Sequence, residues 1–329
     1  MNSFLIIGFG LIGKERFESL ISIKSDDKEF RCDIFDPNLD FEILKNLNNQ
    51  SEKRVSYKVN FEECKNKSYD LVCICTPHNI APYYAKFFLG KDINILIEKP
   101  LGRNMNELNS IKECQNNSDI HVGFNYPYFE CIQELKNDLR NKKFGELISM
   151  DLRIGHGNHP DAKSSWKLSN DLCGGGVLLD PGIHIIDLLL NFFEDDIEII
   201  SAASWNGFWN TGIEEEVKVI LKIKKTLVTF DLSSLKWRSK FEIDINGVNA
   251  YGKICGRGRS YGKQIYTFGE RWSWKNGKSQ AENEITKLES NCTQSFKDEL
   301  QDILNGRKSN LEKSIKGMLI YEEIKEKLL

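Results

Sequence analysis

Three glycines near the amino terminus have the spacing of a phosphate-binding loop. The stretch "IIGFGLIGKERF" contains the pattern G-x-G-x-x-G, formed by Gly8, Phe9, Gly10, Leu11, Ile12 and Gly13. The first glycine permits a tight turn, the second lets a pyrophosphate approach the backbone, and the third lets a helix pack on a strand. A helix that begins there offers free amides and a positive dipole end to an anion. The pattern indicates a dinucleotide site; a methyltransferase loop for a methionine-derived cofactor is the main alternative.

An acidic residue follows at the end of the next strand-like stretch, "RCDIFDPN". The carboxylate of Asp36 could accept hydrogen bonds from ribose hydroxyls, and it would repel a 2′-phosphate. It therefore favours NAD over NADP. NADP stays open, because Asp36 could instead cap the turn "DPN".

A lysine lies at the end of a later strand-like stretch, "ILIEKPLG". Ligands of open α/β sheets bind outside the carboxyl ends of the strands, where Lys99 is expected. A compact cation at that place could hold a substrate hydroxyl and favour its alkoxide form. The alternative is a solvated lysine that pairs with Glu98.

A histidine and two aspartates interrupt an apolar run in "GGGVLLDPGIHIIDLLL". Asp180 and Pro181 fit the N-cap and the first position of a helix, which puts His184 in the first turn. An imidazole titrates at about 6.5 and suits proton transfer. Asp187 lies three residues on and could hydrogen-bond the ring, and the preceding glycines permit close backbone approach. The alternative is a buried structural histidine.

The elements that must position these residues alternate between strand and helix in the first third of the chain. Apolar runs bounded by turn residues indicate strands, and helical patterns lie between them. This order predicts a doubly wound parallel sheet in a dinucleotide-binding Rossmann domain over residues 1–124. The predicted strands are "FLIIGFG", "RCDIFDPN", "VSYKVN", "DLVCICTP", "INILIEKP" and "IHVGFNY", and the predicted helices cover 11–24, 80–90 and 104–116.

The pattern changes after about residue 125. Strand-like stretches with partial alternation follow one another, and fewer helices interrupt them. Residues 125–329 are therefore predicted to form an α+β domain with a mainly antiparallel sheet, with helices at about 129–142 and 181–193. The tail over 295–329 is predicted to be helical, and its last helix could pack back on the first domain.

Composition excludes several kinds of partner. The 329 residues carry a net charge of −3, so no overall basic field exists to hold nucleic acid. No apolar run reaches 18 residues, so we expect no membrane contact. The nine cysteines are odd in number and lack a C-x-x-C pattern, which argues against disulfides and a zinc site and favours a cytoplasmic protein.

The motifs, taken in order, resemble the Gfo/Idh/MocA family of NAD(P)-dependent sugar and inositol oxidoreductases. The glycine loop, "TP" after the fourth strand, "EKP" after the fifth and "GGG…DPGIHIID" cover roughly residues 1–270. The resemblance implies an open-faced second sheet that forms dimers or tetramers. It implies that Lys99, Asp180 and His184 line the substrate site, and that the bond before Pro100 is often cis. We place Thr76, Pro77, Glu98 and Lys99 beside the cofactor, and Asn125 beside both cofactor and substrate.

Two loops bear on the substrate. "RIGHGNHPD" supplies His156 and His159, which fit a polar substrate-binding loop better than a metal site, so no metal is expected. Some members of the family that occur with surface-polysaccharide biosynthesis have a similar "GHG" loop and a following tryptophan, here Trp166, which implies a free or nucleotide-linked sugar. Trp166 could stack on a sugar or serve as a core aromatic. The loop "CGRGRSYGK" (255–263) could meet a substrate phosphate or form a solvated hairpin turn.

These residues together predict hydride transfer between nicotinamide C4 and a carbinol carbon of a sugar, nucleotide sugar or cyclitol. His184 would act as general base or acid, Lys99 would polarise the reacting oxygen, and Asp180 would orient Lys99 or a hydroxyl. The expectation is that His184 and Asp180 face Lys99 across one cleft. Two alternatives remain open: a glycosidase that uses NAD for transient oxidation, and a non-catalytic dinucleotide sensor.

Overall fold

A computed structural model describes the chain over 3–24, 29–38, 55–58, 60–113, 118–158, 166–271 and 284–328. The chain divides into two compact units. The first comprises Met1–Phe124, Asp171–Gly174 and Phe296–Lys316. The second comprises Asn125–Asn170, Gly175–Ser295 and Gly317–Leu329.

The first unit contains a six-stranded sheet in the order β3-β2-β1-β4-β5-β6, and all of its neighbouring strands are parallel. This is the strand order of a doubly wound dinucleotide-binding fold. The predicted fold class is confirmed, and each of the six predicted strands is present. The strands are β1 (Ser3–Ile7), β2 (Arg31–Phe35), β3 (Val55–Lys58), β4 (Leu71–Ile74), β5 (Asn94–Glu98) and β6 (Ile120–Gly123). The helices are α1 (Leu11–Ile23), α3 (Glu62–Lys65), α4 (Ala81–Lys86), α5 (Met105–Glu113) and α10 (Ser295–Leu304), of which α10 belongs to this unit from Phe296.

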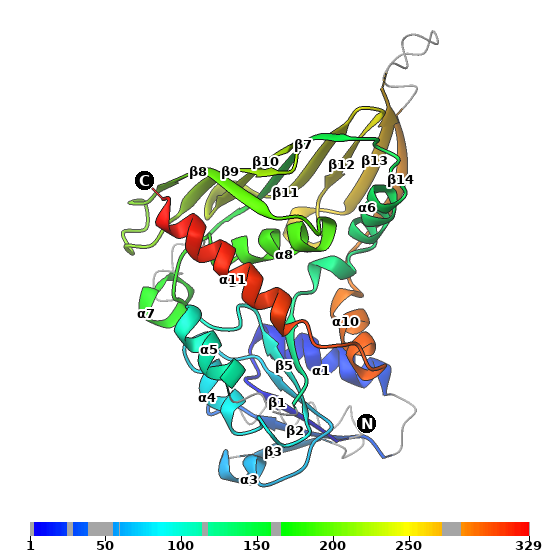
Figure 1. The fold of residues 1–329 in the computed structure, drawn as a ribbon. Coiled ribbons are helices and arrows are strands. Elements are labelled where there is room, and N and C mark those ends of the chain that lie inside the picture. The colour runs from blue at the N-terminus through cyan, green and yellow to red at the C-terminus, as the bar shows by residue number, and fades with distance from the viewer. Residues whose placement is uncertain are drawn as a thin grey trace. The chain divides into compact units, whose positions relative to one another are not determined.

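Alternate side chains of the parallel strands serve two layers of core. Phe4 and Ile6 of β1 pack with Phe17 of α1 and with Leu300 of α10 in one buried cluster. Leu5, between them, is also fully buried, and it points to the opposite face, where α4 and α5 lie (Figure 1). Strands buried on both faces must be apolar at every position, which explains the unbroken apolar runs in the sequence.

The second unit contains an eight-stranded sheet in the order β14-β13-β12-β11-β7-β10-β9-β8. It is mainly antiparallel, as predicted, with one parallel pair, β10 with β7. The strands are β7 (Leu147–Gly157), β8 (Ile197–Trp205), β9 (Glu216–Ile223), β10 (Thr226–Ser233), β11 (Leu235–Gly247), β12 (Ala250–Cys255), β13 (Gln264–Glu270) and β14 (Glu284–Ser290). The edge strand β14 was not predicted, because its half-exposed, charged sequence has no clear apolar alternation.

Helices cover one face of this second sheet. The elements around the sheet are α6 (Glu130–Arg140), α8 (Gly182–Phe192), the second half of α11 (Leu311–Glu326) and the short 3-10 turns η1 (Tyr126–Tyr128), η3 (Trp166–Leu168) and η4 (Arg259–Tyr261). The short helix α7 (Asn170–Cys173) belongs to the first unit from Asp171. Figure 1 shows α6 and α8 along the same face. Met150, Leu152 and Ile154 of β7 are buried on that side. The next residue in this alternation is His156, so the strand carries its histidine toward the helix-covered side.

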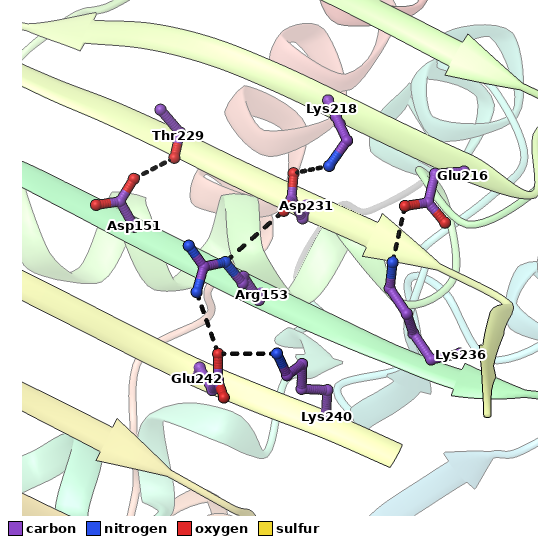
Figure 2. Close-up of polar contacts among 9 residues, drawn as sticks. All are labelled: Asp151, Arg153, Glu216, Lys218, Thr229, Asp231, Lys236, Lys240 and Glu242. Atoms are coloured by element: carbon purple, nitrogen blue, oxygen red, sulfur yellow. Dashed lines mark hydrogen bonds and ion pairs between the residues drawn. The ribbon is translucent and has the colours of Figure 1, made fainter. Parts of the chain in front are cut away.

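The other face of the second sheet carries charged side chains. Arg153 of β7 lies 3.3 Å from Glu242 of β11 and 3.7 Å from Asp231 of β10. Lys218 of β9 donates to the same Asp231 over 2.8 Å. Figure 2 shows this ladder of alternating charges across neighbouring strands. Cross-strand pairs of opposite charge stabilise a sheet modestly, and they leave the face polar.

Two further observations concern the described residues as a whole. None of the helices there is long and apolar enough to cross a membrane. The eight cysteines in the same ranges are all free thiols.

Candidate functional site

The three glycines of the amino-terminal loop have different surroundings. Gly8 has a φ of +86°, and a Cβ on it would lie 2.6 Å from the carbonyl oxygen of Cys75. A Cβ on Gly13 would lie 2.0 Å from the carbonyl oxygen of Gly8. A Cβ on Gly10, in contrast, would meet nothing within 4 Å. Two glycines therefore permit close packing, and the third leaves open space in front of the first turn of α1.

The residues between the glycines divide between core and surface. Phe9 is buried and packs edge-on against Phe17, with ring centroids 5.7 Å apart. Leu11 is 66% exposed at the start of α1, and Ile12 is half-buried. Gly10 is the N-cap residue, so no side chain there competes for the first helical amides. Those amides and the open space suit an anionic ligand.

Asp36 braces the glycine loop and also caps its own turn. Its Oδ2 accepts a hydrogen bond from the Phe9 amide over 2.7 Å, and its Oδ1 accepts one from the Asn38 amide over 2.8 Å. The turn-capping alternative is therefore observed. The contact between Asp36 and a ribose stays a prediction. The Asp36 carboxylate lies beside the glycine loop, and this position is compatible with such a contact.

The carboxyl end of β4 adds a buried polar atom to the same edge. Thr76 follows Cys75, and its methyl group lies 3.1 Å from the position of a Cβ on Gly8. Within the part of the chain that the structure describes, the buried Oγ1 of Thr76 has no hydrogen-bond partner. Pro77 contributes its carbonyl to the following turn, accepting from the amides of Ile80 and Ala81 over 3.2 Å each. The open glycine, the free helix start and the Thr76 hydroxyl together fit a dinucleotide.

Glu98 has a partner inside the protein. Its Oε1 accepts a hydrogen bond from Arg16 Nε over 2.8 Å, and Arg16 Nη2 lies 2.7 Å from Oε2 of Glu299. Burial raises the pKa of the Glu98 carboxyl, and the attraction of Arg16 opposes that shift only in part. The cluster ties β5 to α1 and α10. It gives Glu98 a structural role, and the predicted contact with a cofactor stays a prediction.

Lys99 leaves the end of β5 half-buried. The peptide bond between Lys99 and Pro100 is cis, as the resemblance implied. Arg16 is the main partner of the Glu98 carboxylate, and Lys99 adds a weaker electrostatic attraction to it, so the alternative of a lysine beside Glu98 stays open. Lys99 therefore lies at the strand end where ligands of such sheets bind.

The start of α8 differs from the prediction. Asp180 is not the N-cap and Pro181 is not the first helical residue: α8 begins at Gly182, Pro181 occupies the cap position, and the Asp180–Pro181 bond is cis. The reason is that backbone carbonyls already satisfy the first amides, Gly182 to Val177 over 2.8 Å and His184 to Pro181 over 3.0 Å. The carboxylate of Asp180 is thereby available to Lys167, whose Nζ lies 3.0 Å from Oδ2.

The glycines before α8 pack against protein. A Cβ on Gly176 would lie 2.0 Å from the carbonyl oxygen of Glu214. The Glu214 carboxylate accepts hydrogen bonds from the amides of Gly176 and Leu178 over 2.9 and 3.2 Å. The close approach predicted for this segment is therefore made by the chain itself.

His184 lies in the first turn of α8, as predicted, and only 5% of it is exposed. Its imidazole lies flat on the ring of Tyr126, with centroids 3.8 Å apart and an interplanar angle of 5°. Asp187 accepts a hydrogen bond from the Asn191 amide over 3.0 Å. A bond from Asp187 to the imidazole stays a prediction. The stacking fixes the plane of the ring that is proposed to move the proton.

A second group of side chains continues from Tyr126. The guanidinium carbon of Arg257 lies 5.2 Å from the centroid of the Tyr126 ring and 3.9 Å from that of Tyr261. The Tyr261 hydroxyl and Nδ1 of His156 are 3.2 Å apart. Burial lowers the pKa of His156; the negative charge of Asp180 opposes this shift, and Lys167 and Arg257 add to it. His156 is therefore neutral near neutral pH.

Sequence reasoning missed two members of this group and undervalued a third. Tyr126 and Tyr261 were not among the candidate residues, and Arg257 was only one of three cations in a loop. The available signal was the aromatic residue that follows the second arginine in "GRGRSYG". A tyrosine close to arginines among glycines is typical of a cation held over a ring.

The remaining predicted residues have these places. Asn125 is buried and donates from Nδ2 to Ser295 Oγ over 3.1 Å. Trp166 is half-buried in η3, and Lys167 Nζ lies 5.8 Å from its ring centroid. His159 lies outside the described residues. Lys99 belongs to the first unit, and Asp180 and His184 belong to the second. That these three residues form one site is a proposal.

Comparison with known proteins identifies the family. Residues 3–126 match the model of the oxidoreductase family with an NAD-binding Rossmann fold, and residues 132–251 match that of the GFO/IDH/MocA C-terminal domain. This chain belongs to the Gfo/Idh/MocA family. Its first unit is therefore an NAD-binding Rossmann domain, as the glycine loop predicted.

Three relatives illustrate the range of this family. Glucose-6-phosphate 3-dehydrogenase of Bacillus subtilis (strain 168) is 26% identical over 200 residues, which are 60% of this chain and 55% of that protein. A levoglucosan dehydrogenase solved with NADH and levoglucosan superposes with a TM-score of 0.81 at 14% identity, covering 99% of this chain and 97% of the other. A myo-inositol 2-dehydrogenase of Lactobacillus plantarum gives 0.76 at 18% identity, covering 99% and 97%.

These matches set what can be stated of the whole protein. The match to the Bacillus enzyme spans little more than half of that enzyme's length. The two structural matches lie below 20% identity, and they establish the fold.

Proposed function

We propose that this protein is an NAD-dependent oxidoreductase that transfers a hydride to or from a carbinol carbon of a sugar or cyclitol. The observation that carries the proposal is the buried imidazole of His184, held flat against Tyr126 in a chain of an NAD-binding family. The stack holds the imidazole in one plane beside polar side chains, which supports a role in proton transfer.

The chemistry divides between the cofactor and the protein. NAD, when bound, supplies the two-electron acceptor or donor for the hydride. His184 takes the hydroxyl proton during oxidation and returns it to the carbonyl oxygen during reduction. Lys99 holds the reacting oxygen and stabilises negative charge on it. Asp180, already 3.0 Å from Lys167, orients a neighbouring hydroxyl or Lys99.

The glycine loop and Asp36 would hold the cofactor. The pyrophosphate would lie over Gly10, where a Cβ would meet nothing within 4 Å, and the ribose would lie beside Asp36. Thr76 would supply its unsatisfied hydroxyl from the end of β4. An acid that braces the loop disfavours a 2′-phosphate, which supports NAD in preference to NADP.

The range of substrates is suggested by the relatives and by one loop. The names of the relatives include a dehydrogenase of glucose 6-phosphate, one of levoglucosan and one of myo-inositol. The "GHG" loop of this chain places His156 near Asp180 and Arg257. A sugar or nucleotide sugar of surface-polysaccharide synthesis is included in the proposal on the strength of that loop and Trp166.

Assembly is proposed through the open face of the second sheet. This face carries the charge ladder of Arg153, Asp231 and Glu242, and it also presents Ile220 and Leu227, which are 39% and 45% exposed. A mixture of complementary charges and exposed aliphatic groups suits a symmetric contact between copies. We propose a homodimer or homotetramer in the cytoplasm. Light scattering of wild type and of Leu227→Asp checks the assembly, and an unchanged mass would contradict it.

One experiment tests the proposed activity. Purified protein is mixed with NAD(H) or NADP(H) and a panel of sugars, sugar phosphates and cyclitols, and absorbance at 340 nm is followed. We expect turnover with NAD, and a loss of roughly 10²- to 10⁴-fold in kcat for His184→Ala, because general acid–base help is worth that much. Lys91→Ala changes an exposed lysine of the first unit and serves as the matched control.

The outcomes separate the alternatives. Turnover of an aryl glycoside without net NADH would indicate a glycosidase that uses transient oxidation. NADH binding without redox activity across the whole panel would indicate a dinucleotide sensor. Equal activity of wild type and His184→Ala would contradict the proton-transfer role.

A further inference from the structure

Arg257 of the second unit is half-buried beside two tyrosine rings. Its guanidinium lies between Tyr126 and Tyr261, with its carbon 5.2 and 3.9 Å from the two ring centroids. Across the described ranges, its buried Nε has no hydrogen-bond partner. The loop's other cations differ: Lys263 forms an ion pair with Glu289, and Arg259 is exposed.

The charge of Arg257 persists despite its burial. Burial lowers the pKa of its guanidinium, but Tyr126, Tyr261 and Asp180 raise it, and the net direction is upward. The carboxylate of Asp180 lies 3.0 Å from Lys167 and thus has a cation of its own. A guanidinium keeps its proton and offers donors in a planar fork that matches phosphate and carboxylate oxygens. Arg257 has a hydrogen bond with Tyr261, but its Nε has no acceptor in the described ranges, and an anion bound there would supply one.

Tyr126 links this cation to the proposed catalytic histidine. The Tyr126 ring has the imidazole of His184 at 3.8 Å and the guanidinium carbon of Arg257 at 5.2 Å. The separation of the two groups is therefore at most the sum of these distances. A single sugar ring with one exocyclic substituent can span such a gap, with a hydroxyl at His184 and the substituent at Arg257.

We propose that Arg257 binds an anionic substituent of the substrate, so that the protein acts on acidic sugars, phosphorylated or carboxylated, in preference to neutral ones. That the ligand is a sugar substrate rests on the proposed oxidoreductase function. That the protein recognises an anionic group on it rests on Arg257, Tyr126 and Tyr261. The Tyr261 ring centroid lies 3.9 Å from the guanidinium carbon, and its hydroxyl lies 3.2 Å from Nδ1 of His156. With Lys167 and Arg257 as cations and Asp180 as the anion, these three side chains have a net positive charge, which favours an anionic ligand.

The kinetic test compares substrates that differ in one charged group. Wild type is assayed with NAD and glucose, glucose 6-phosphate, glucuronate and a UDP-linked hexose. We expect kcat/KM for at least one anionic sugar to exceed that for glucose by tenfold or more. The preference should fall by about ten- to hundredfold in Arg257→Gln, because charge-assisted hydrogen bonds are of that strength. The identity of the preferred sugar distinguishes a phosphate from a carboxylate.

Two further variants serve as controls. Arg259→Gln removes a cation of the same loop whose side chain is exposed, and it should keep the wild-type preference. Arg257→Lys keeps the charge but loses the fork, and it should retain only part of the preference. A preference for neutral sugars in wild type, or a preference unchanged in Arg257→Gln, would overturn the inference.

A binding test separates failure of this inference from failure of the proposed function. Thermal unfolding of the full chain is followed with inorganic phosphate and with glucose 6-phosphate, against chloride at equal ionic strength. We expect a rise in Tm that scales with ligand concentration in wild type and in Arg259→Gln and is lost in Arg257→Gln. If no sugar is oxidised but this rise is observed, the oxidoreductase proposal fails and the anion site stands. If sugars are oxidised but the rise is absent or independent of Arg257, the anion site fails.

Discussion

Two arginines, the fully buried Arg16 of the first unit and the half-buried Arg257 of the second, have different surroundings. Arg16 of the first unit is fully buried, and it lies 2.7 Å from both Glu98 and Glu299. Arg257 of the second unit lies between two tyrosine rings, with its Nε unsatisfied across the described ranges. Each cation has one buried nitrogen without a hydrogen-bond partner in the described ranges, Nη1 of Arg16 and Nε of Arg257. The difference is that two carboxylates of its own unit neutralise Arg16, whereas the neighbours of Arg257 are tyrosine rings. We infer that the first holds the scaffold together, whereas the second is kept available for a ligand.

The same contrast occurs between glycines. Gly13 allows α1 to pack closely on the loop, because a Cβ there would lie 2.0 Å from the Gly8 carbonyl oxygen. Gly10 has nothing within 4 Å of a Cβ and an ordinary extended conformation, with a φ of −68° and a ψ of −161°. Gly13 therefore serves packing within the protein, and Gly10 leaves open space for a ligand. Substitutions at such matched positions should therefore affect either stability or binding, but rarely both.

The largest effect is expected from Arg16→Met. The change leaves Glu98 and Glu299 buried without their cation, which typically costs about 3–5 kcal/mol of unfolding free energy. Urea unfolding followed by circular dichroism measures the loss, with exposed Arg259→Met as a control that should change it by less than about 0.5 kcal/mol. Adding Glu98→Leu and Glu299→Leu should restore part of the stability. A wild-type unfolding free energy for Arg16→Met would remove the structural half of the comparison.

A buried base without a partner provides the second test. His121 of β6 is fully buried, and in the described ranges neither ring nitrogen has a hydrogen-bond partner. Burial, with a smaller effect from Arg307, lowers the pKa of His121 to about 4. The unfolded chain binds the proton near 6.5, so stability is full above that pH and falls as pH drops toward 4.

The resulting loss for this one group should be about 2 kcal/mol of unfolding free energy at pH 5. Urea unfolding of wild type and of His121→Leu at pH 7.5 and 5 measures it. We expect the variant to lose distinctly less stability than wild type over that interval. Parallel losses in the two proteins would show that His121 does not contribute.

Gly10→Ala should weaken NADH binding and leave the fold intact. Its Cβ projects into the space proposed for the pyrophosphate, so the Kd should rise by tenfold or more, about 1.4 kcal/mol. Fluorescence titration with NADH measures this change. Gly13→Ala is the counterpart, and it should lower Tm because its Cβ collides with the loop. A destabilised Gly10→Ala with normal affinity would reverse the assignment of the two glycines.

The smallest effect is expected on the stability of Arg257→Met. Removing this half-buried cation, whose Nε lacks a partner in the described ranges, relieves a desolvation cost, and it loses stacking with tyrosine worth about 0.5–2 kcal/mol. The two nearly cancel, so the unfolding free energy should change by less than about 1 kcal/mol, measured by urea unfolding beside Arg16→Met. A loss as large as that of Arg16→Met would mean that Arg257 is structural.

Features that depend on one continuous stretch of sequence could be predicted. The glycine loop, the six parallel strands and the position of His184 in a first helical turn each depend on local pattern, and the structure has them where they were expected. Glu98 and Asp180 show what local pattern omits. Their partners, Arg16 and Lys167, are fixed by tertiary packing, so neither role could be read from neighbouring residues.

The second unit's polar cluster was the hardest part to predict. Tyr126, His156, His184 and Arg257 come from four separate segments, and no spacing in the sequence relates them. The start of α8 also lies one residue beyond the expected one, because Pro181 and not Asp180 occupies the cap position. The edge strand β14 was missed because edge strands carry polar residues.

We propose that Lys99 of the first unit and His184 of the second act on one substrate. A double-mutant cycle measures this directly, using kcat/KM with NAD for wild type, Lys99→Met, His184→Asn and the double variant. Residues that act as one catalytic unit show strongly non-additive losses. We predict that kcat/KM of the double variant is only slightly lower than that of the less active single variant. Losses that simply multiply, each variant reducing kcat/KM independently of the other, would contradict the account.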